Sequence, residues 1–245
     1  MGEPLSVDLD QPPGPRCSTP TYFFDSDTPA LAAFARATAG DAATPTEKAV
    51  RLYYAVRDRI RYDPAFCNLS REQFRAGAVL AQGRGFCIPK ALLLATLARA
   101  QGIPAALGLA DVRNHLSTPE MLEGMDTDRF FHGYTVMHLQ GKWVKVSPAF
   151  NLSMCERFRV LPLEWDGKQD ALLHPYDALD RRHMEYLADH GVIWDLPYEL
   201  VMATLWARFP GYMARLAQGE GGRVQPSRVA PATADPAAFF PPGGA

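Results

Sequence analysis

The chain has 245 residues, 47% of them hydrophobic, and a formal net charge of -2 at pH 7. This length and composition allow one domain with a substantial core. Basic and acidic residues are interspersed, which excludes the strongly basic surface typical of nucleic-acid-binding and membrane-surface proteins. We therefore expect a peptide or a small molecule as partner, with no nucleic acid and no membrane.

Residues 1–20 carry five prolines and no regular apolar period, which predicts an extended N-terminal arm. No basic segment followed by an apolar one is present, and no run reaches the roughly 18 apolar residues of a membrane span. The cysteines include no Cys-x-x-Cys pair, so neither a zinc site nor a redox pair is indicated and all four should be reduced. They are Cys17, Cys67, Cys87 and Cys155. The sequence predicts a soluble, cytoplasmic protein without cofactor or metal.

Two helix starts precede residue 60. Asp27 or Thr28 can cap a helix that runs to Gly40. Thr44 and Glu47 have the spacing of a capping box, which predicts a second helix to about Ile60. A short helix is expected over 70–74.

The segment 83–104 predicts a buried helix with a cysteine at its start. Gly83 and Gly85 allow a sharp turn before Cys87, and Pro89 falls in the first turn, where a missing N–H is tolerated. Apolar residues surround the helix until Gly102. A helix N-terminus favours an anion, so we expect a lowered pKa and a nucleophilic thiolate at Cys87. The alternative is a cysteine that only packs in the core.

After residue 104 the pattern changes to short apolar runs. Strands are predicted over 105–112, 130–139 and 143–146, and the last two form a hairpin around residues 140–142. Helices followed by strands are typical of an α+β fold. A short helix is possible after Pro119.

From residue 152 the pattern is weaker. Residues 155–158, 163–167 and 181–187 fit either short strands or short helices, and a closing helix over 198–216 is interrupted near Pro210. Glycine, proline and alanine then dominate. The predicted organisation is an arm over 1–20, one domain over 21–217 and a flexible tail over 218–245.

An ordered set of motifs lies between Arg51 and Asn151. The helix starts at Gly-x-Cys and ends in Arg-Ala-x-Gly-Ile-Pro. It is followed by His-x-Tyr on one predicted strand and Gly-x-Trp-Val-x-Val on the next. This set resembles the transglutaminase-like superfamily, which is related to papain-fold cysteine proteases. The resemblance implies a helical N-terminal half whose catalytic helix packs on an antiparallel sheet, and a Cys-His-Asp triad.

Carried over to this chain, the resemblance implies that Cys87 is the nucleophile and His132 the general base. The position of the aspartate, in Val-Asp-Pro, is occupied by Ser147 in Val146-Ser147-Pro148. A hydroxyl can orient an imidazole but does not stabilise its charged form as a carboxylate does. A thiolate forms its own ion pair with imidazolium, so a dyad assisted by Ser147 could still work. The pattern also resembles a bacterial branch of undefined substrate in which a hydroxyl residue here is not unusual.

Several other residues could contribute. His138 is a rival base on the same strand face as His132, and Asp111, with His115 nearby, could supply the missing carboxylate. Gln82 could donate to an oxyanion, and the positive charges of Arg84 and Lys90 could favour a thiolate. Tyr134 and Trp143 are expected near the cleft and would suit an apolar or peptide-like ligand. A metal site formed by His132 and His138 lacks a further ligand at recognisable spacing.

These residues favour acyl transfer from an amide or ester carbonyl through an acyl-enzyme at Cys87. Water as acceptor makes the protein a protease or amidase, which analogy with bacterial members favours. An amine as acceptor makes it a transglutaminase. A third interpretation, from a different class, is a binding or scaffold module that has lost catalysis with its aspartate.

Overall fold

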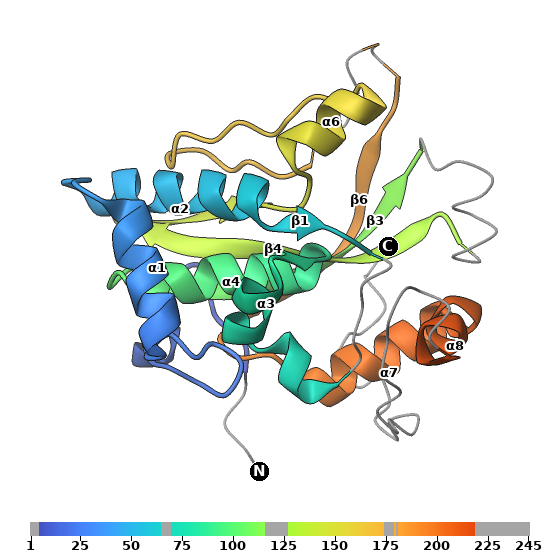
Figure 1. Ribbon diagram of the computed structural model, residues 1–245, viewed down its shortest axis with the longest axis horizontal. Helices are drawn as coiled ribbons and strands as arrows, with labels where there is room; N and C mark the ends of the chain where they lie inside the picture. The colour runs from blue at the N-terminus through green and yellow to red at the C-terminus, as the bar shows by residue number, and fades with distance from the viewer. Residues whose placement is uncertain (1–4, 65–69, 116–126, 174–178, 180, 219–245) are drawn as a thin grey trace.

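The computed structural model describes residues 5–64, 70–115, 127–173, 179 and 181–218. An antiparallel sheet packs against helices formed by the first hundred residues, which confirms the predicted α+β fold (Figure 1). Cys67, the proposed helix after Pro119 and the C-terminal tail from residue 219 lie outside the described residues.

The first two helices begin and end at the predicted signals. Helix α1 (Pro29–Ala39) follows Thr28 and ends at Gly40, whose φ of 54° suits glycine. Helix α2 (Pro45–Arg59) has the capping box. Glu47 N donates to Thr44 Oγ1 at 3.2 Å, and Thr44 N donates to the Glu47 carboxylate at 3.0 Å. Each such cap contributes roughly 1 kcal/mol.

The chain then makes a 3₁₀ turn, η2 (Arg71–Phe74), and a short helix, α3 (Ala76–Gln82), which the sequence pattern did not separate. Helix α4 (Cys87–Arg99) follows, and all of its residues are buried, as predicted. It packs on the sheet with one side and on α1, α2 and α3 with the others.

The strands of the main sheet are β3 (Ala105–Asn114), β4 (Arg129–Leu139), β5 (Lys142–Val146) and β6 (Met184–Ile193), in the order β5-β4-β3-β6. The predicted hairpin joins β4 to β5, and both turn residues, Gln140 and Gly141, have the positive φ of a type I′ turn. Strand β6 is longer than the ambiguous segment 181–187 suggested, and it pairs with β3.

The two faces of the sheet have different cover. Odd-numbered residues of β4, such as Met137 and Leu139, belong to the core formed with α4. Even-numbered residues, such as Tyr134 and Val136, pack instead against the N-terminal segment around Val7 and Cys17. By this alternation His132 belongs to the face away from α4, so it can meet a side chain of α4 only at an edge of the sheet.

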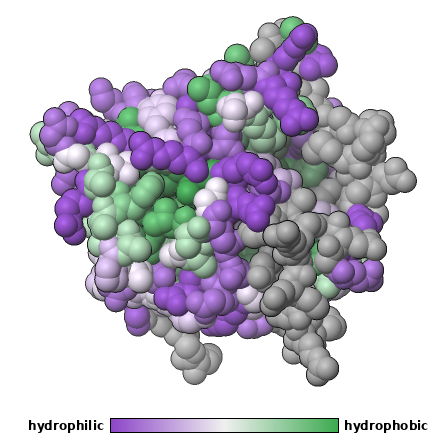
Figure 2. All heavy atoms as spheres, in the orientation of Figure 1, coloured by the Kyte–Doolittle hydropathy of each residue, from purple (hydrophilic) through white to green (hydrophobic). Residues whose placement is uncertain are grey.

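Helix α6 (Leu152–Phe158) lies on one side of the end of the sheet, and α7 (Tyr198–Arg208) and α8 (Pro210–Gln218) lie on the other (Figure 1). The break between α7 and α8 confirms the predicted interruption near Pro210. Hydrophilic residues cover most of the face in Figure 2, with a more apolar area around α1. Within the described segments, no helix combines the length and apolarity that a bilayer crossing requires.

Candidate active site

Cys87 is held at the first position of α4 by a small parallel pairing. Strand β1 (Arg61–Tyr62) pairs with β2 (Arg84–Gly85), which leads directly into the helix. A Cβ on Gly85 would lie 3.2 Å from the Cβ of Pro89, so glycine permits the tight entry. The Gly-x-Gly-x-Cys sequence thus places the thiol at a defined point of the sheet.

That point is an edge of β4. The β4–β5 ladder extends from Leu139–Lys142 to Thr135–Val146, and Pro148, beyond it, has no N–H to continue the pattern. Cys87 Sγ occupies this edge: it donates to the Phe131 carbonyl oxygen at 3.8 Å and lies near the Gly133 N–H. A Cβ on Gly133 would lie 2.8 Å from Ile88 Cα, so this glycine allows the first turn of α4 to approach.

The predicted lowering of the Cys87 pKa is wrong. Burial raises the pKa of the thiol to about 11, and the nearby N–H groups of Gly133, Ile88 and Cys87 offset only part of that increase. The proposed cations do not act on the thiol. Arg84 lies 3.6 Å from Asp63, and Lys90 Nζ donates to the carbonyl oxygens at the C-terminal end of α2. The resting thiol is therefore neutral.

His132 is also buried and neutral. Burial lowers its pKa to about 3, and its ring makes a T-shaped contact with Tyr186 at a centroid separation of 6.0 Å. Its Nε2 lies 3.3 Å from Ser147 Oγ. Ser147 is 2% exposed and lines a small cavity with Cys155 and His183, separate from the main cleft. The Ser147 hydroxyl thus contacts Nε2 of the imidazole, and Nδ1 is the ring nitrogen that remains for another partner.

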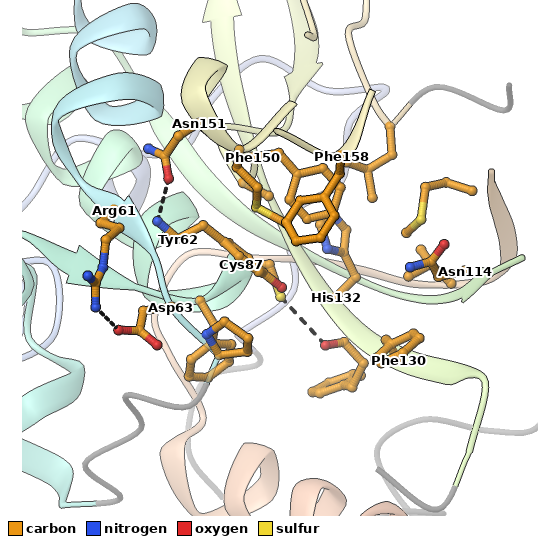
Figure 3. A pocket seen from close by; sticks show the side chains of 18 of the residues that line it. Arg61, Tyr62, Asp63, Cys87, Asn114, Phe130, His132, Phe150, Asn151 and Phe158 are labelled. Carbon is orange, nitrogen blue, oxygen red and sulfur yellow. Dashed lines mark hydrogen bonds and ion pairs between the residues drawn. The ribbon is translucent and has the colours of Figure 1, made fainter. Parts of the chain in front are cut away.

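Cys87 and His132 both line a cleft of about 730 Å³ at the end of the sheet (Figure 3). Its walls come from β1, β4, α6, α7 and α8 and are mostly apolar. Among the described residues, the structure records no hydrogen bond between Cys87 Sγ and the imidazole. The thiol and the ring are thus together in one cleft as two neutral groups, not as a formed ion pair.

The structure adds Tyr62, which sequence reasoning missed. Its side chain lines the cleft and points toward Cys87 (Figure 3). Burial raises the pKa of this phenol well above its ordinary range, and Cys87 contributes to the increase. Asn151, also buried at the cleft, fixes the Tyr62 backbone, because its Oδ1 accepts from Tyr62 N at 2.5 Å. Arg61-Tyr62 follows α2 after the single residue Ile60, and no local signal distinguished it from the end of that helix.

Two proposed alternatives lie elsewhere. His138 packs its ring against Trp143 and is about 20 Å along β4 from His132, which rules out a shared metal. Asp111 is opposite Phe131 in the β3–β4 register, so it is on the face opposite to His132. It pairs there with Arg208 and with His190 at 3.0 Å.

The remaining residues proposed from the sequence also lie outside the cleft. Gln82 ends α3 and does not line the cleft, and His115 Nε2 lies 2.8 Å from Glu185. Tyr134 and Trp143 were expected at the cleft, but they do not line it and pack instead with the N-terminal segment. Tyr134 donates to Asp189, and the Trp143 Nε1–H donates to a backbone oxygen of the N-terminal segment. Cys17, Cys87 and Cys155 are buried free thiols. No group of three or more His, Cys, Asp or Glu side chains within the described residues could hold a metal ion.

Two solved structures are similar to parts of this chain. The chain resembles two solved structures, a candidate cysteine protease from Cytophaga hutchinsonii and a candidate protease from Parabacteroides distasonis, each at 17% identity. The TM-scores are 0.45 and 0.34, and the alignments cover 75% and 47% of this chain. This chain spans only 54% and 22% of the length of those proteins. Among curated proteins, no sequence gives a significant match.

The family comparison is more direct. A model of the transglutaminase-like superfamily matches residues 32–148. The matched span includes α4, the β4–β5 hairpin, and all three of Cys87, His132 and Ser147. Residues 32–148, just under half of the chain, thus match the transglutaminase-like superfamily.

Proposed function

We propose that the protein is a cysteine-dependent enzyme that hydrolyses an amide or ester through an acyl-thioester at Cys87. The observation that carries this proposal is the placement of Cys87, at the N-terminus of α4, and of His132, supported by Ser147, in the wall of one cleft. A nucleophile, a base and a group that orients the base are the minimum for acyl transfer.

The protonation states define how the first step proceeds. With Nε2–H donating to Ser147 Oγ, His132 presents the Nδ1 lone pair as a base. Sγ attacks the carbonyl carbon while its proton moves to Nδ1. His132 then protonates the leaving amine or alcohol, and the bond from carbonyl carbon to leaving group breaks. Water attacks the thioester, His132 takes a proton from it, and the thiol is restored with release of the acid.

Two donors are available for the oxyanion of each tetrahedral intermediate. The N–H of Cys87 is in the first turn of α4, where helix N–H groups have no intrahelical partner. The Tyr62 hydroxyl, directed toward Cys87, is a second donor, and its raised pKa keeps it protonated. Both act where negative charge develops, which supports the assignment of the cleft as the reaction site.

The test uses activated esters and amides with wild-type protein, Cys87→Ala and Cys17→Ala. Cys17 is a matched control because it is also a buried cysteine but packs on the face of the sheet away from α4. We expect an acyl adduct on the Cys87 peptide by mass spectrometry, and turnover that Cys17→Ala keeps and Cys87→Ala loses. Full turnover by Cys87→Ala would contradict the proposal. Added amines that capture the acyl group would identify the transglutaminase variant of the reaction.

One observation favours a second candidate, a binding module. Cys87 and His132 are both neutral, and no hydrogen bond between them is recorded in the described part of the chain. A binding module would form no acyl adduct with any activated ester, and its ligand affinity would be the same in wild type and Cys87→Ala.

A further inference from the structure

The cleft that contains Cys87 is lined mostly by apolar side chains. Aromatic and aliphatic side chains dominate both walls: Phe130, Phe150 and Phe158 on the side of α6, and Leu205, Phe209 and Met213 on the side of α7 and α8. A cleft of about 730 Å³ is large enough to bury most of a drug-sized ligand. Phe158, at the mouth, is 55% exposed, so an apolar group entering the cleft would cover it.

The cleft has few charged side chains, and they differ in whether they form an ion pair within the described residues. Arg61 pairs with Asp63, which also lies 3.6 Å from Arg84. Arg157, on α6, has its guanidinium 5.5 Å from the centroid of the Phe158 ring and makes no ion pair with any carboxylate in the described residues. The cleft therefore combines an apolar interior with an available cation at its rim. An arginine in this position complements a carboxylate, which it can bind through two parallel hydrogen bonds.

We propose that the cleft selects amides in which a large apolar acyl group is joined to an amine that carries a carboxylate, such as N-acylated amino acids with a medium-length chain. This specificity rests on the proposed function, because it places the scissile carbonyl at Cys87. The aromatic walls hold the acyl chain, and Arg157 holds the carboxylate. Hydrolysis consumes one water, breaks the amide C–N bond, and releases an apolar carboxylic acid and an amino acid.

Binding to the intact Cys87→Ala variant tests the specificity without requiring turnover. The ligands are N-octanoylglycine, N-acetylglycine and N-methyloctanamide, measured by isothermal titration calorimetry. Each buried methylene contributes roughly fourfold in affinity, so the six additional methylenes of the octanoyl ligand predict at least a hundredfold tighter binding than acetyl even when burial is incomplete. N-methyloctanamide, which lacks the carboxylate, should bind about tenfold more weakly than N-octanoylglycine.

Two substitutions on the exposed surface of α6 separate the two contributions. Phe158→Ala should reduce the preference for octanoyl over acetyl. Arg157→Gln should remove the preference for N-octanoylglycine over N-methyloctanamide and leave the chain-length preference intact. Arg36→Gln is the matched control, because Arg36 is an exposed arginine of α1 outside the cleft.

Equal affinity for the octanoyl and acetyl ligands would overturn the proposal. So would a carboxylate preference that persists in Arg157→Gln. Hydrolysis assays with the wild-type protein distinguish failure of the proposed specificity from failure of the proposed function. Selective binding without hydrolysis of N-octanoylglycine contradicts the enzyme and supports the ligand class. Equal rates of hydrolysis for both acyl glycines support the enzyme and overturn the ligand class.

Discussion

Restoring a carboxylate behind His132 should activate Cys87. Ser147→Asp places an acidic group at the position from which Ser147 Oγ now contacts His132 Nε2 at 3.3 Å. Burial lowers the pKa of His132 from 6.5 to about 3, which corresponds to about 5 kcal/mol against the imidazolium. An adjacent carboxylate raises the pKa of its partner by roughly one to three units. It would therefore recover a substantial part of that energy and favour proton transfer from the thiol.

The expected change in the alkylation rate of Cys87 follows from the pKa of its thiol. A thiol with a pKa of about 11 is thiolate in only about one molecule in 10⁴ at pH 7. A decrease of about two units would raise the alkylation rate at pH 7 roughly a hundredfold. Ser147 borders a small cavity shared with Cys155 and His183, toward which the larger side chain would extend.

The assay is the rate of iodoacetamide labelling between pH 6 and pH 10, followed on the Cys87 peptide by mass spectrometry. The Cys17 peptide is the internal reference, because its thiol is buried outside the main cleft and away from Ser147. Ser147→Asn is the matched control, since it has nearly the same shape as Asp without the charge. If Ser147→Asp and Ser147→Asn label at the same rate over the whole range, the electrostatic reasoning is refuted.

Three further predictions concern the same region. Tyr62→Phe should lower turnover of the best ester by roughly a hundredfold without changing the melting temperature, as steady-state kinetics and circular dichroism would check. His132→Ala should reduce turnover by at least a hundredfold more than Ser147→Ala, and equal losses would make the hydroxyl a full participant. Burial lowers the pKa of Lys90 from 10.5 to about 7. Between these pH values the unfolded chain binds a proton that the folded chain does not, so the free energy of unfolding decreases as the pH falls through this window. The free energy of unfolding measured in urea should therefore be about 2 kcal/mol higher at pH 9 than at pH 7 because of this lysine, and Lys90→Met should remove that difference.

Local signals were sufficient for much of the fold. The Thr44–Glu47 capping box, the Gly-x-Gly turn before Cys87 and the Gln140-Gly141 turn each depend on neighbours a few residues away, and each is present in the structure. Helix α3 was missed because seven residues are too short to show a helical period. Strand β6 was ambiguous because its register depends on pairing with β3, which is distant in sequence.

The family motif anticipated that Cys87, His132 and Ser147 lie near one another, and their catalytic roles stay predictions; the electrostatics of the thiol could not be anticipated. The pKa of Cys87 was predicted in the wrong direction, because a helix terminus is visible in sequence while the burial around it is not. Asp111 was considered without knowledge of its strand register, which directs it away from His132. Tyr62 could not be found from sequence, because only the parallel pairing of β1 with β2 brings it to the thiol.

Both edges of the main sheet are covered by short bridges to other parts of the chain. Ser6 pairs with Ile193 on β6, where Val7 N donates to Val192 O at 2.8 Å and Trp194 N donates to Leu5 O at 2.9 Å. On β5, Val146 bridges to Ala171, and Ala171 N donates to Lys145 O at 2.8 Å. Exposed strand edges template the addition of further strands and are sites of aggregation. The first described residues thus protect the sheet against edge-to-edge association, although they lie far from the cysteine.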